Sequence, residues 1–356
     1  MQNVPHGGGL AASGEAVLRM LALSSSTTPT TPPAIEVEAL AKRYGEVDAV
    51  RGVSFTVAPG EVFGFLGPNG AGKSTTINML CTLARPTSGA ARVHGFDVVH
   101  QRDDVRRHIG LVFQDPSLDV QLTATQNLRL HAELYDIEPG AIPARMDQML
   151  EMVDLADRRD QPVLTFSGGM KRRLEIARGL MHSPRVLFLD EPTIGLDPQT
   201  RSAIWRYIRA LQASEGTTIF MTTHYMDEAE HCDRIAIMDR GEIVVLDTPE
   251  ALKASVGADR VVLGTVDDEA AIAALRDRFG IEATTAEGAV TFHVAGGEAF
   301  VPRLFAELGV AITSVTVARP TLDDVFLRYT GSTLRDAEAS PDRQPTMAQF
   351  FSKAGR

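Results

Sequence analysis

A glycine-rich segment that ends in lysine, serine and threonine is the strongest chemical signal in the sequence. Residues 67–75 fit the phosphate-binding pattern G-x-x-x-x-G-K-[ST] at every required position. The glycines allow successive backbone N–H groups to turn toward an anion, and a helix beginning there adds the positive end of its dipole. Lys73 is expected to contact the β- and γ-phosphates, and Ser74 to ligate Mg²⁺. The segment predicts a nucleoside triphosphate site with these contacting residues: Gly67, Pro68, Asn69, Gly70, Ala71, Gly72, Lys73, Ser74 and Thr75.

An acidic pair follows a second apolar run. Residues 186–189 read as a buried strand, and Asp190 and Glu191 come directly after it. Sheets of parallel strands bind ligands at the carboxyl ends of those strands. We expect Asp190 to hold Mg²⁺ through water and Glu191 to act as general base on the attacking water. Such a pair is common as a plain strand end, but its combination with the phosphate loop favours catalysis.

A third segment, Ser167-Gly168-Gly169, opens a predicted helix. Ser167 is a good N-cap, and the helix start offers a hydroxyl, backbone N–H groups and a dipole to a phosphate. Three such residues alone would favour an ordinary capped helix.

The elements that must position these residues follow from the hydrophobic pattern. From residue 35 to about residue 246, short apolar strands alternate with amphipathic helices, which predicts a largely parallel α/β sheet. A smaller region from about residue 260 reads strand–helix–strand–strand–helix–strand–helix, which predicts a compact α+β appendage. Both ends of the chain are rich in residues that bury little apolar surface, which predicts flexible arms. The predicted division is an N-terminal arm at 1–34, an α/β nucleotide-binding domain at 35–250, a C-terminal domain at 251–331 and a tail at 332–356.

Composition excludes several classes of protein. The 356 residues include 46 acidic and 35 basic side chains, a formal charge of −11, which disfavours a dedicated nucleic-acid binder. Two cysteines cannot build a disulfide framework, which favours a reducing compartment. No stretch approaches the roughly 20 apolar residues that a membrane-spanning helix needs.

Taken together, the motifs resemble those of the ATP-binding cassette (ABC) ATPases. Residues 164–171 are similar to that family's signature sequence, with Phe166 and Met170 in place of the usual leucine and glutamine. The resemblance implies that Tyr44 stacks on adenine, that Gln114 contacts the metal or the attacking water, and that His224 contacts the γ-phosphate. It also implies that residues 195–198 form a loop at a dimer interface. By the same resemblance, Ser167, Gly168 and Gly169 contact the nucleotide of a facing copy in a head-to-tail pair. The implied fold is a P-loop NTPase of the ABC type, with a mostly parallel core sheet, an antiparallel β part, a helical insert and a small α+β appendage.

Finer features are similar to the daunorubicin/doxorubicin resistance ATP-binding subunits. They are residues 114–119, 167–170, 223–229 and 320–327. The resemblance implies a subunit that binds and hydrolyses ATP with Mg²⁺ and powers efflux of a hydrophobic compound, such as a drug, antibiotic or lipid. It implies a separate polytopic membrane permease of the type-2 exporter class and a second cassette subunit, with a homodimer expected. The location implied is peripheral, on the cytoplasmic face of the cell membrane.

The helical insert at about 123–164 is expected to carry the face that receives the permease. Leu128, Leu130 and Leu134 are candidates for that face, although packing within their own domain explains any one of them equally well. The alternative function is a soluble ABC ATPase that acts on nucleic acid or ribosomes. That class predicts tandem cassettes, a long coiled-coil insert or a basic surface, and the sequence has one cassette, no such insert and a net negative charge. A third possibility is a phosphotransferase that uses the same phosphate loop. Such an enzyme would not need residues 167–169 or His224, so their presence argues against it.

Overall fold

The structure is a computed structural model that describes residues 32–286 and 289–331. The arms predicted at 1–34 and 332–356 lie outside the described residues, apart from residues 32–34.

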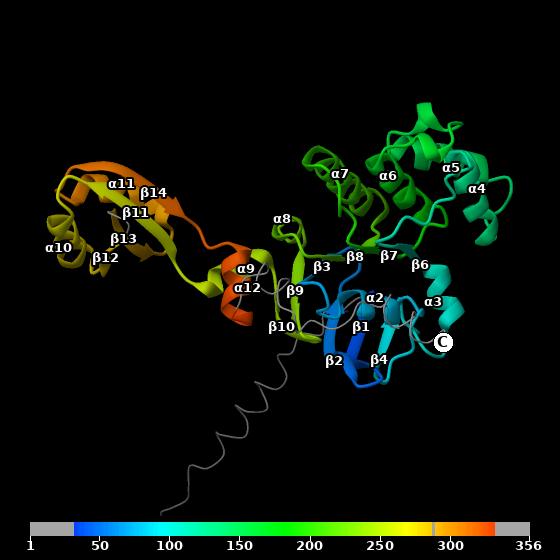
Figure 1. Cartoon of the computed structure of the whole chain (residues 1–356), viewed down its shortest axis with the longest axis horizontal. Coiled ribbons are helices and arrows are strands. Elements are labelled where there is room, and N and C mark those ends of the chain that lie inside the picture. The colour runs from blue at the N-terminus through cyan, green and yellow to red at the C-terminus, as the bar shows by residue number, and fades with distance from the viewer. Residues whose placement is uncertain (1–31, 287–288, 332–356) are drawn as a thin grey trace, which may run out of the picture. The chain divides into compact units, whose positions relative to one another are not determined.

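A six-stranded sheet forms the centre of the α/β domain (Figure 1). Its order is β10-β9-β3-β8-β7-β6, with neighbouring strands parallel from β9 to β6 and β10 antiparallel to β9. The strands are β3 (Val62–Leu66), β6 (Ile109–Val112), β7 (Val186–Asp190), β8 (Thr218–Thr223), β9 (Arg234–Asp239) and β10 (Glu242–Asp247). The predicted α/β fold with a mostly parallel sheet is confirmed.

The central strands are apolar on both faces because both faces are covered. In β3, Val62 and Leu66 join one hydrophobic core, while Phe63 and Phe65 join the other. This division follows from the two-residue period of side chains along a strand. The two cores fix the sheet between two layers, so the carboxyl ends of β3, β7 and β8 are held in register.

One layer is helical, and the other is an antiparallel sheet with two helices (Figure 1). The helical layer contains α4 (Ala124–Leu134), α5 (Ile142–Met152), α6 (Gly168–Gly179) and α7 (Pro198–Glu215), with 3-10 turns η1 (Ala156–Arg158) and η2 (Val163–Thr165) and the short helix α8 (Met226–Ala229). The antiparallel sheet has the order β2-β1-β4-β5. Its layer contains β1 (Ile35–Tyr44), β2 (Val47–Val57), β4 (Ser88–Val93), β5 (Phe96–Asp97), α2 (Lys73–Leu80) and α3 (Arg102–His108).

The C-terminal region has its own sheet, of order β12-β13-β11-β14, and its own hydrophobic core. Its elements are β11 (Asp259–Thr265), α10 (Asp268–Phe279), β12 (Ala283–Ala286), β13 (Ala289–Val294), α11 (Gly297–Glu307), β14 (Ile312–Ala318) and α12 (Leu322–Thr330). This is the element order that the sequence predicts.

The last helix does not join the core of the C-terminal sheet. Leu322, Val325 and Phe326 of α12 belong instead to a hydrophobic core of the α/β domain, together with Leu252 of α9 (Pro249–Val256). The boundary predicted at 250/251 falls within α9, and the domain limits stay predictions. Every helix within residues 32–286 and 289–331 is too short or too polar to cross a lipid bilayer.

Candidate nucleotide-binding site

The glycine-rich loop lies between the end of β3 and the start of α2, as the motif predicts. Gly72 adopts a φ of +105°, a region that side chains avoid. A Cβ on Gly72 would lie 2.5 Å from the carbonyl oxygen of Ala49, and one on Gly67 would lie 2.2 Å from that of Met238. Backbone from β2 and β9 therefore packs directly against this loop, which leaves room only for glycine at both positions.

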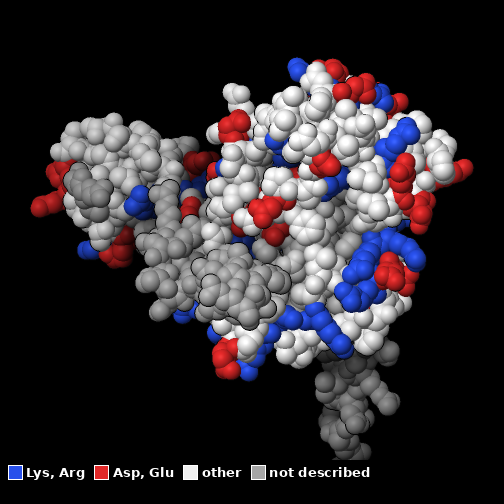
Figure 2. Space-filling view, turned by 45° about the vertical axis from the view of Figure 1, so that its right-hand side comes forward, with Lys and Arg blue, Asp and Glu red and all other residues white. Residues whose placement is uncertain are grey.

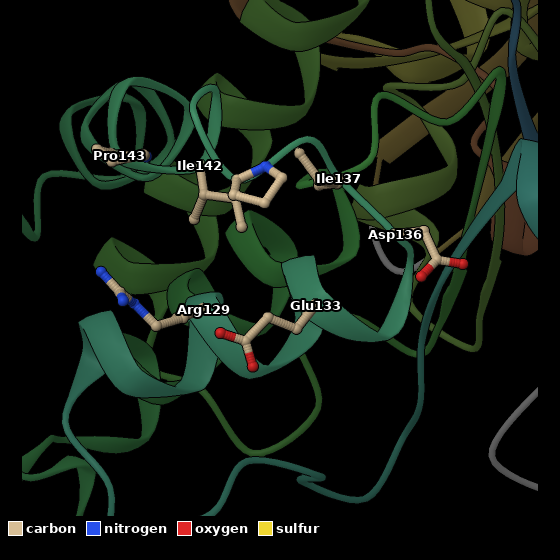
Figure 3. A pocket seen from close by; sticks show the side chains of 7 residues that line it. Arg129, Glu133, Asp136, Ile137, Ile142 and Pro143 are labelled. Carbon is tan, nitrogen blue, oxygen red and sulfur yellow. The ribbon is translucent and has the colours of Figure 1, made fainter.

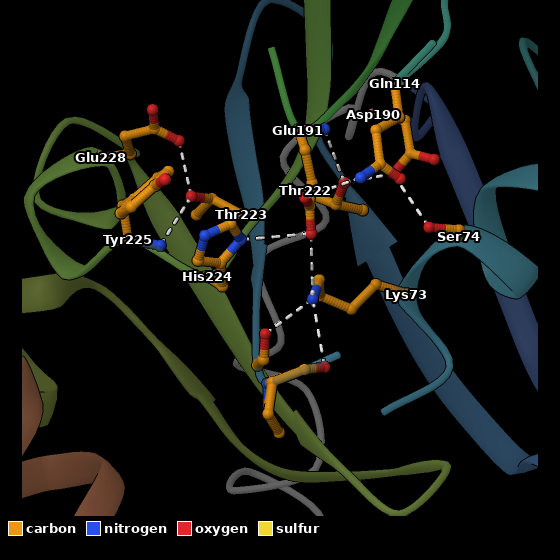
Figure 4. A network of polar contacts seen from close by, with 12 residues as sticks. Lys73, Ser74, Gln114, Asp190, Glu191, Thr222, Thr223, His224, Tyr225 and Glu228 are labelled. Atoms are coloured by element: carbon orange, nitrogen blue, oxygen red, sulfur yellow. Dashed lines mark hydrogen bonds and ion pairs between the residues drawn. The ribbon is translucent and has the colours of Figure 1, made fainter. Parts of the chain in front are cut away.

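Lys73, the first residue of α2, is buried, and its ammonium group points back across the loop (Figure 4). Nζ donates to the carbonyl oxygens of Gly67 at 2.6 Å and Pro68 at 3.2 Å, and lies 3.5 Å from Oε1 of Glu191. The cation is thus held between the loop and the acidic residue at the end of β7. This is where a phosphate bound by the loop would meet a positive charge.

Two hydroxyl groups bind the carboxylate of Asp190 (Figure 4). The Ser74 hydroxyl donates to Oδ1 of Asp190 at 3.1 Å, and the Thr222 hydroxyl donates to the same oxygen at 2.5 Å. Burial raises the pKa of Asp190, and the hydrogen bonds from Thr222 and Ser74 oppose that rise. Hydroxyl and carboxylate oxygens are the ligands that Mg²⁺ prefers, so this donor set fits the metal.

Glu191 lies at the centre of the cluster in Figure 4. Its carboxylate oxygens lie 3.5 Å from Lys73 Nζ and 3.3 Å from His224 Nδ1, and one accepts a bond at 3.3 Å from Nε2 of Gln114. Burial on its own raises the pKa of Glu191, but the neighbouring His224 and Lys73 outweigh it, so the pKa lies below its ordinary value. The side chain is therefore a carboxylate at neutral pH, as a general base must be.

The backbone of Glu191 is strained. Its φ is +47°, an uncommon conformation for a residue with a side chain, and its N–H donates to the Thr222 hydroxyl at 3.0 Å. The strain fits a residue whose carboxylate must be aimed at one place.

The fold brings together six of the predicted site residues: Lys73, Ser74, Gln114, Asp190, Glu191 and His224. They come from α2, from the ends of β7 and β8 and from the segment after β6. The convergence follows from the parallel order of β3, β8, β7 and β6, which places those ends at one edge of the sheet.

Two other predicted sites lie apart from this cluster. Ser167 caps α6, with its hydroxyl accepting from the N–H of Met170 at 3.3 Å, and both Ser167 and Gly168 are exposed to solvent. A Cβ on Gly169 would lie 2.4 Å from the side chain of Thr200, so the start of α6 packs closely on α7. Tyr44 is half-buried at the end of β1, with Lys42 Nζ 4.7 Å from its ring centroid.

Sequence reasoning missed Thr222 and Arg172. Thr222 is fully buried and binds both acidic residues, and the only signal for it was its place at the end of the apolar strand β8. Arg172 donates to the backbone carbonyl oxygens of both acidic residues and of Pro192, which follows them. The sequence signal that could have identified Arg172 was the acidic residue Glu175, which lies three positions later on the same helix.

Comparison with known proteins agrees with this geometry. Residues 50–194 match the ABC transporter family, and residues 248–330 match the C-terminal domain of DrrA1-3-like ATP-binding proteins. The chain is 42% identical to the daunorubicin resistance ATP-binding protein DrrA3 of Streptomyces coeruleorubidus, over 86% of this chain and 99% of that protein. It is 39% identical to the linearmycin resistance ATP-binding protein LnrL of Bacillus subtilis, over 85% of this chain and 100% of that protein.

A solved structure is similar as well. The ATP-binding cassette MJ0796, in a dimeric post-hydrolysis state bound to ADP and Pi, aligns with a TM-score of 0.55 and 28% identity, over 60% of this chain and 98% of that one. The chain therefore belongs to the ABC transporter family and is the ATP-binding and ATP-hydrolysing subunit of an exporter.

Proposed function

We propose that this subunit works as one of two identical cassettes on the cytoplasmic face of the cell membrane, joined to a polytopic permease of the type-2 exporter class. The proposed cargo is a hydrophobic compound. This choice of cargo is supported by the names of relatives, which refer to resistance to daunorubicin and linearmycin and to export of Nod factor. The observation that carries the proposal is the cluster around Glu191, because hydrolysis there supplies the free energy for transport.

In the proposed mechanism, the loop at 67–75 binds the phosphates of ATP and Lys73 supplies the positive charge beside them. Ser74, Asp190 and Gln114 would hold Mg²⁺, which when bound offsets negative charge on the phosphate oxygens. Glu191 is a carboxylate held by its neighbours, so it accepts a proton from the water that attacks the γ-phosphate. Gln114 orients that water, and His224 keeps the Glu191 carboxylate in place.

The signature segment completes the site from a second copy. Ser167 and Gly168 are exposed at the start of α6, so they can contact the nucleotide of a facing subunit, while Tyr44 stacks on adenine in its own. Contacts that exist only with the triphosphate favour the closed pair, and hydrolysis removes them. This population shift is the proposed source of force on the permease.

The helical layer offers a face for the permease. Leu130 and Leu134 on α4 are 48% and 71% exposed, which suits them for contact with another protein. Leu128 is fully buried, so the packing interpretation is the correct one for that residue. A pocket of about 360 Å³ in the same layer is lined by Arg129 and Glu133 of α4 and by Ile142 and Pro143 of α5 (Figure 3).

Action on nucleic acid has less support. Figure 2 shows basic and acidic side chains interspersed on the face in view. On helix α3, Arg106 and Arg107 pair with Asp103 and Asp104 at 3.7 and 3.3 Å. The acidic partners offset the positive charge that would attract a phosphate backbone.

The test is to isolate membranes from cells that produce the tagged full chain, solubilise them and measure ATP hydrolysis of the purified complex. We expect the chain to co-purify with a polytopic membrane protein and the complex to hydrolyse ATP faster when a hydrophobic cargo is added. Recovery of the chain with ribosomes or RNA, and none with membranes, would instead support the alternative.

A further inference from the structure

Arg172 uses every N–H donor of its guanidinium group. It lies in the second turn of α6 and is 7% exposed. An arginine has five N–H groups, and five bonds are present here. The acceptors are the carbonyl oxygens of Phe113, Asp190, Glu191 and Pro192 and the carboxylate of Glu175.

Three of those bonds reach the strained backbone at the end of β7. The carbonyl oxygens of Pro192, Asp190 and Glu191 lie 2.6, 3.1 and 3.3 Å from the arginine nitrogens. Thr222 holds the N–H of Glu191 from the other side at 3.0 Å. A φ of +47° persists only where the surroundings fix it, and these contacts are what fix it.

The same face of α6 also holds the segment that contains Gln114. Arg172 donates to the carbonyl oxygen of Phe113, the residue before Gln114. Glu175 is 1% exposed and accepts from the N–H of Ser117 at 2.7 Å, and Arg178 donates to the Ser117 carbonyl oxygen at 2.7 Å. Residues three apart on a helix share a face, so residues 172, 175 and 178 act on this segment together.

We propose that Arg172, paired with Glu175, is a positioning residue that joins the signature helix α6 to the catalytic carboxylate and to the Gln114 segment. The proposal rests on the function proposed above for Glu191, Gln114 and Ser167. When a facing nucleotide moves the start of α6, the arginine carries that movement to Phe113 and to the backbone of Glu191. ATP hydrolysis therefore depends on closure of the two facing subunits.

Stability alone explains this pair poorly. A buried ion pair loses about as much free energy from desolvation as it gains from attraction, and apolar replacements are often neutral. A matched arginine shows what a purely structural role looks like. Arg145 of α5 donates to the carbonyl oxygens of Leu180 at 2.7 Å and Met181 at 3.2 Å, at the other end of α6, and pairs with Glu215 at 3.2 Å.

The experiment uses the full chain and measures kcat and KM for ATP hydrolysis, the dissociation constant for ATP, and the thermal midpoint. The variants are Arg172→Gln, Arg172→Lys and Arg172→Gln with Glu175→Gln, and the matched control is Arg145→Gln. We expect Arg172→Gln to lower kcat by about tenfold or more, because a small misplacement of a catalytic group has a large effect on rate. The dissociation constant for ATP should change by less than about threefold, because the loop at 67–75 is untouched.

The other variants separate positioning from charge and from stability. Arg172→Lys keeps the charge without the planar fork, so its kcat should stay low. The double variant removes both charges and leaves no buried charge unpaired, so its thermal midpoint should lie close to that of the parent. Its kcat should remain as low as that of Arg172→Gln. Arg145→Gln should lower the midpoint and keep kcat within about threefold of the parent.

Two outcomes would overturn the inference while leaving the proposed function intact. One is a parental kcat in Arg172→Gln, and the other is an equal fall in Arg145→Gln. A Glu191→Gln arm tests the function itself, because hydrolysis at the parent rate in that variant would overturn the general-base assignment and this inference with it.

Discussion

Lys73 Nζ lies 3.5 Å from Oε1 of Glu191, and both side chains are about 95% buried. The cation of the phosphate loop and the acid at the end of β7 therefore form one buried ion pair. Its strength depends on both members, because a buried charge left alone is strongly destabilising. A nucleotide that enters the loop meets a lysine already aligned by the acid.

Replacing Lys73 with alanine should abolish hydrolysis. The change removes the side-chain cation that we place beside the phosphates and leaves Glu191 without its lysine partner, so we expect kcat/KM to fall by at least about 100-fold. Steady-state hydrolysis and calorimetric ATP titration measure the effect. Lys253→Ala is the control, since that lysine of α9 forms a partly exposed ion pair with Glu230, which follows α8. Parental hydrolysis by Lys73→Ala would refute the loop assignment.

Replacing Glu191 with glutamine should keep ATP binding and trap the closed pair. The amide accepts no proton from water, so the triphosphate contacts persist. Size-exclusion chromatography with ATP and Mg²⁺ should then show a dimer for the variant and a smaller dimer fraction for the parent. Monomer alone, with the membrane partner present, would count against paired cassettes.

Glycine at position 72 should be indispensable for binding. Alanine would adopt a φ of +105° and place its Cβ 2.5 Å from the Ala49 carbonyl oxygen, so the loop must shift. We expect ATP affinity to fall by about tenfold or more, since the phosphate-binding N–H groups move with the loop. Gly140→Ala is the matched control, because nothing lies within 4 Å of a Cβ there and its φ is ordinary. Equal ATP affinity in the two variants would contradict the prediction.

Glu228 should make folding stability fall with rising pH. Burial raises the pKa of its carboxyl group to about 7, against about 4.5 when unfolded. Between these values the folded chain binds more protons than the unfolded chain, so the free energy of unfolding decreases as pH rises and levels off above about 7. Glu228→Gln keeps an acceptor for the Thr223 hydroxyl, which donates at 2.5 Å, and removes the titration.

Urea unfolding of both chains at pH 5 and pH 8 measures this effect. The stability of the variant relative to the parent should increase with pH by an amount on the order of 3 kcal/mol. A pH-independent difference would show that the burial of Glu228 does not govern its protonation.

The sequence predicts the site where the chemistry is carried by residues close together in the chain. The loop at 67–75 needs particular backbone angles and a helix start, so its pattern alone identifies it. Thr222 and Arg172 escaped prediction because their importance comes from which carbonyl and carboxylate groups the folded sheet brings to them. Leu128 shows the same limit, since its apolar side chain fits a surface or a core equally well until packing decides.

The element order of the C-terminal region was also predictable from periodicity, but the role of its last helix was not. The amphipathic pattern of α12 shows that one face is buried and does not show against which core. Leu322, Val325 and Phe326 pack with the ATPase fold because α9 leaves an apolar surface at Leu252. That choice depends on contacts about 70 residues apart in the chain.

Because α12 packs with α9, residues 259–318 form an insertion, and the helices before and after it both pack in the same hydrophobic core. A truncation at residue 258 would strip Leu322, Val325 and Phe326 from that core and leave Leu252 facing water. Exchanging residues 259–318 between relatives while keeping α9 and α12 would leave this core intact. The properties of such chimaeras should therefore report on the inserted region itself.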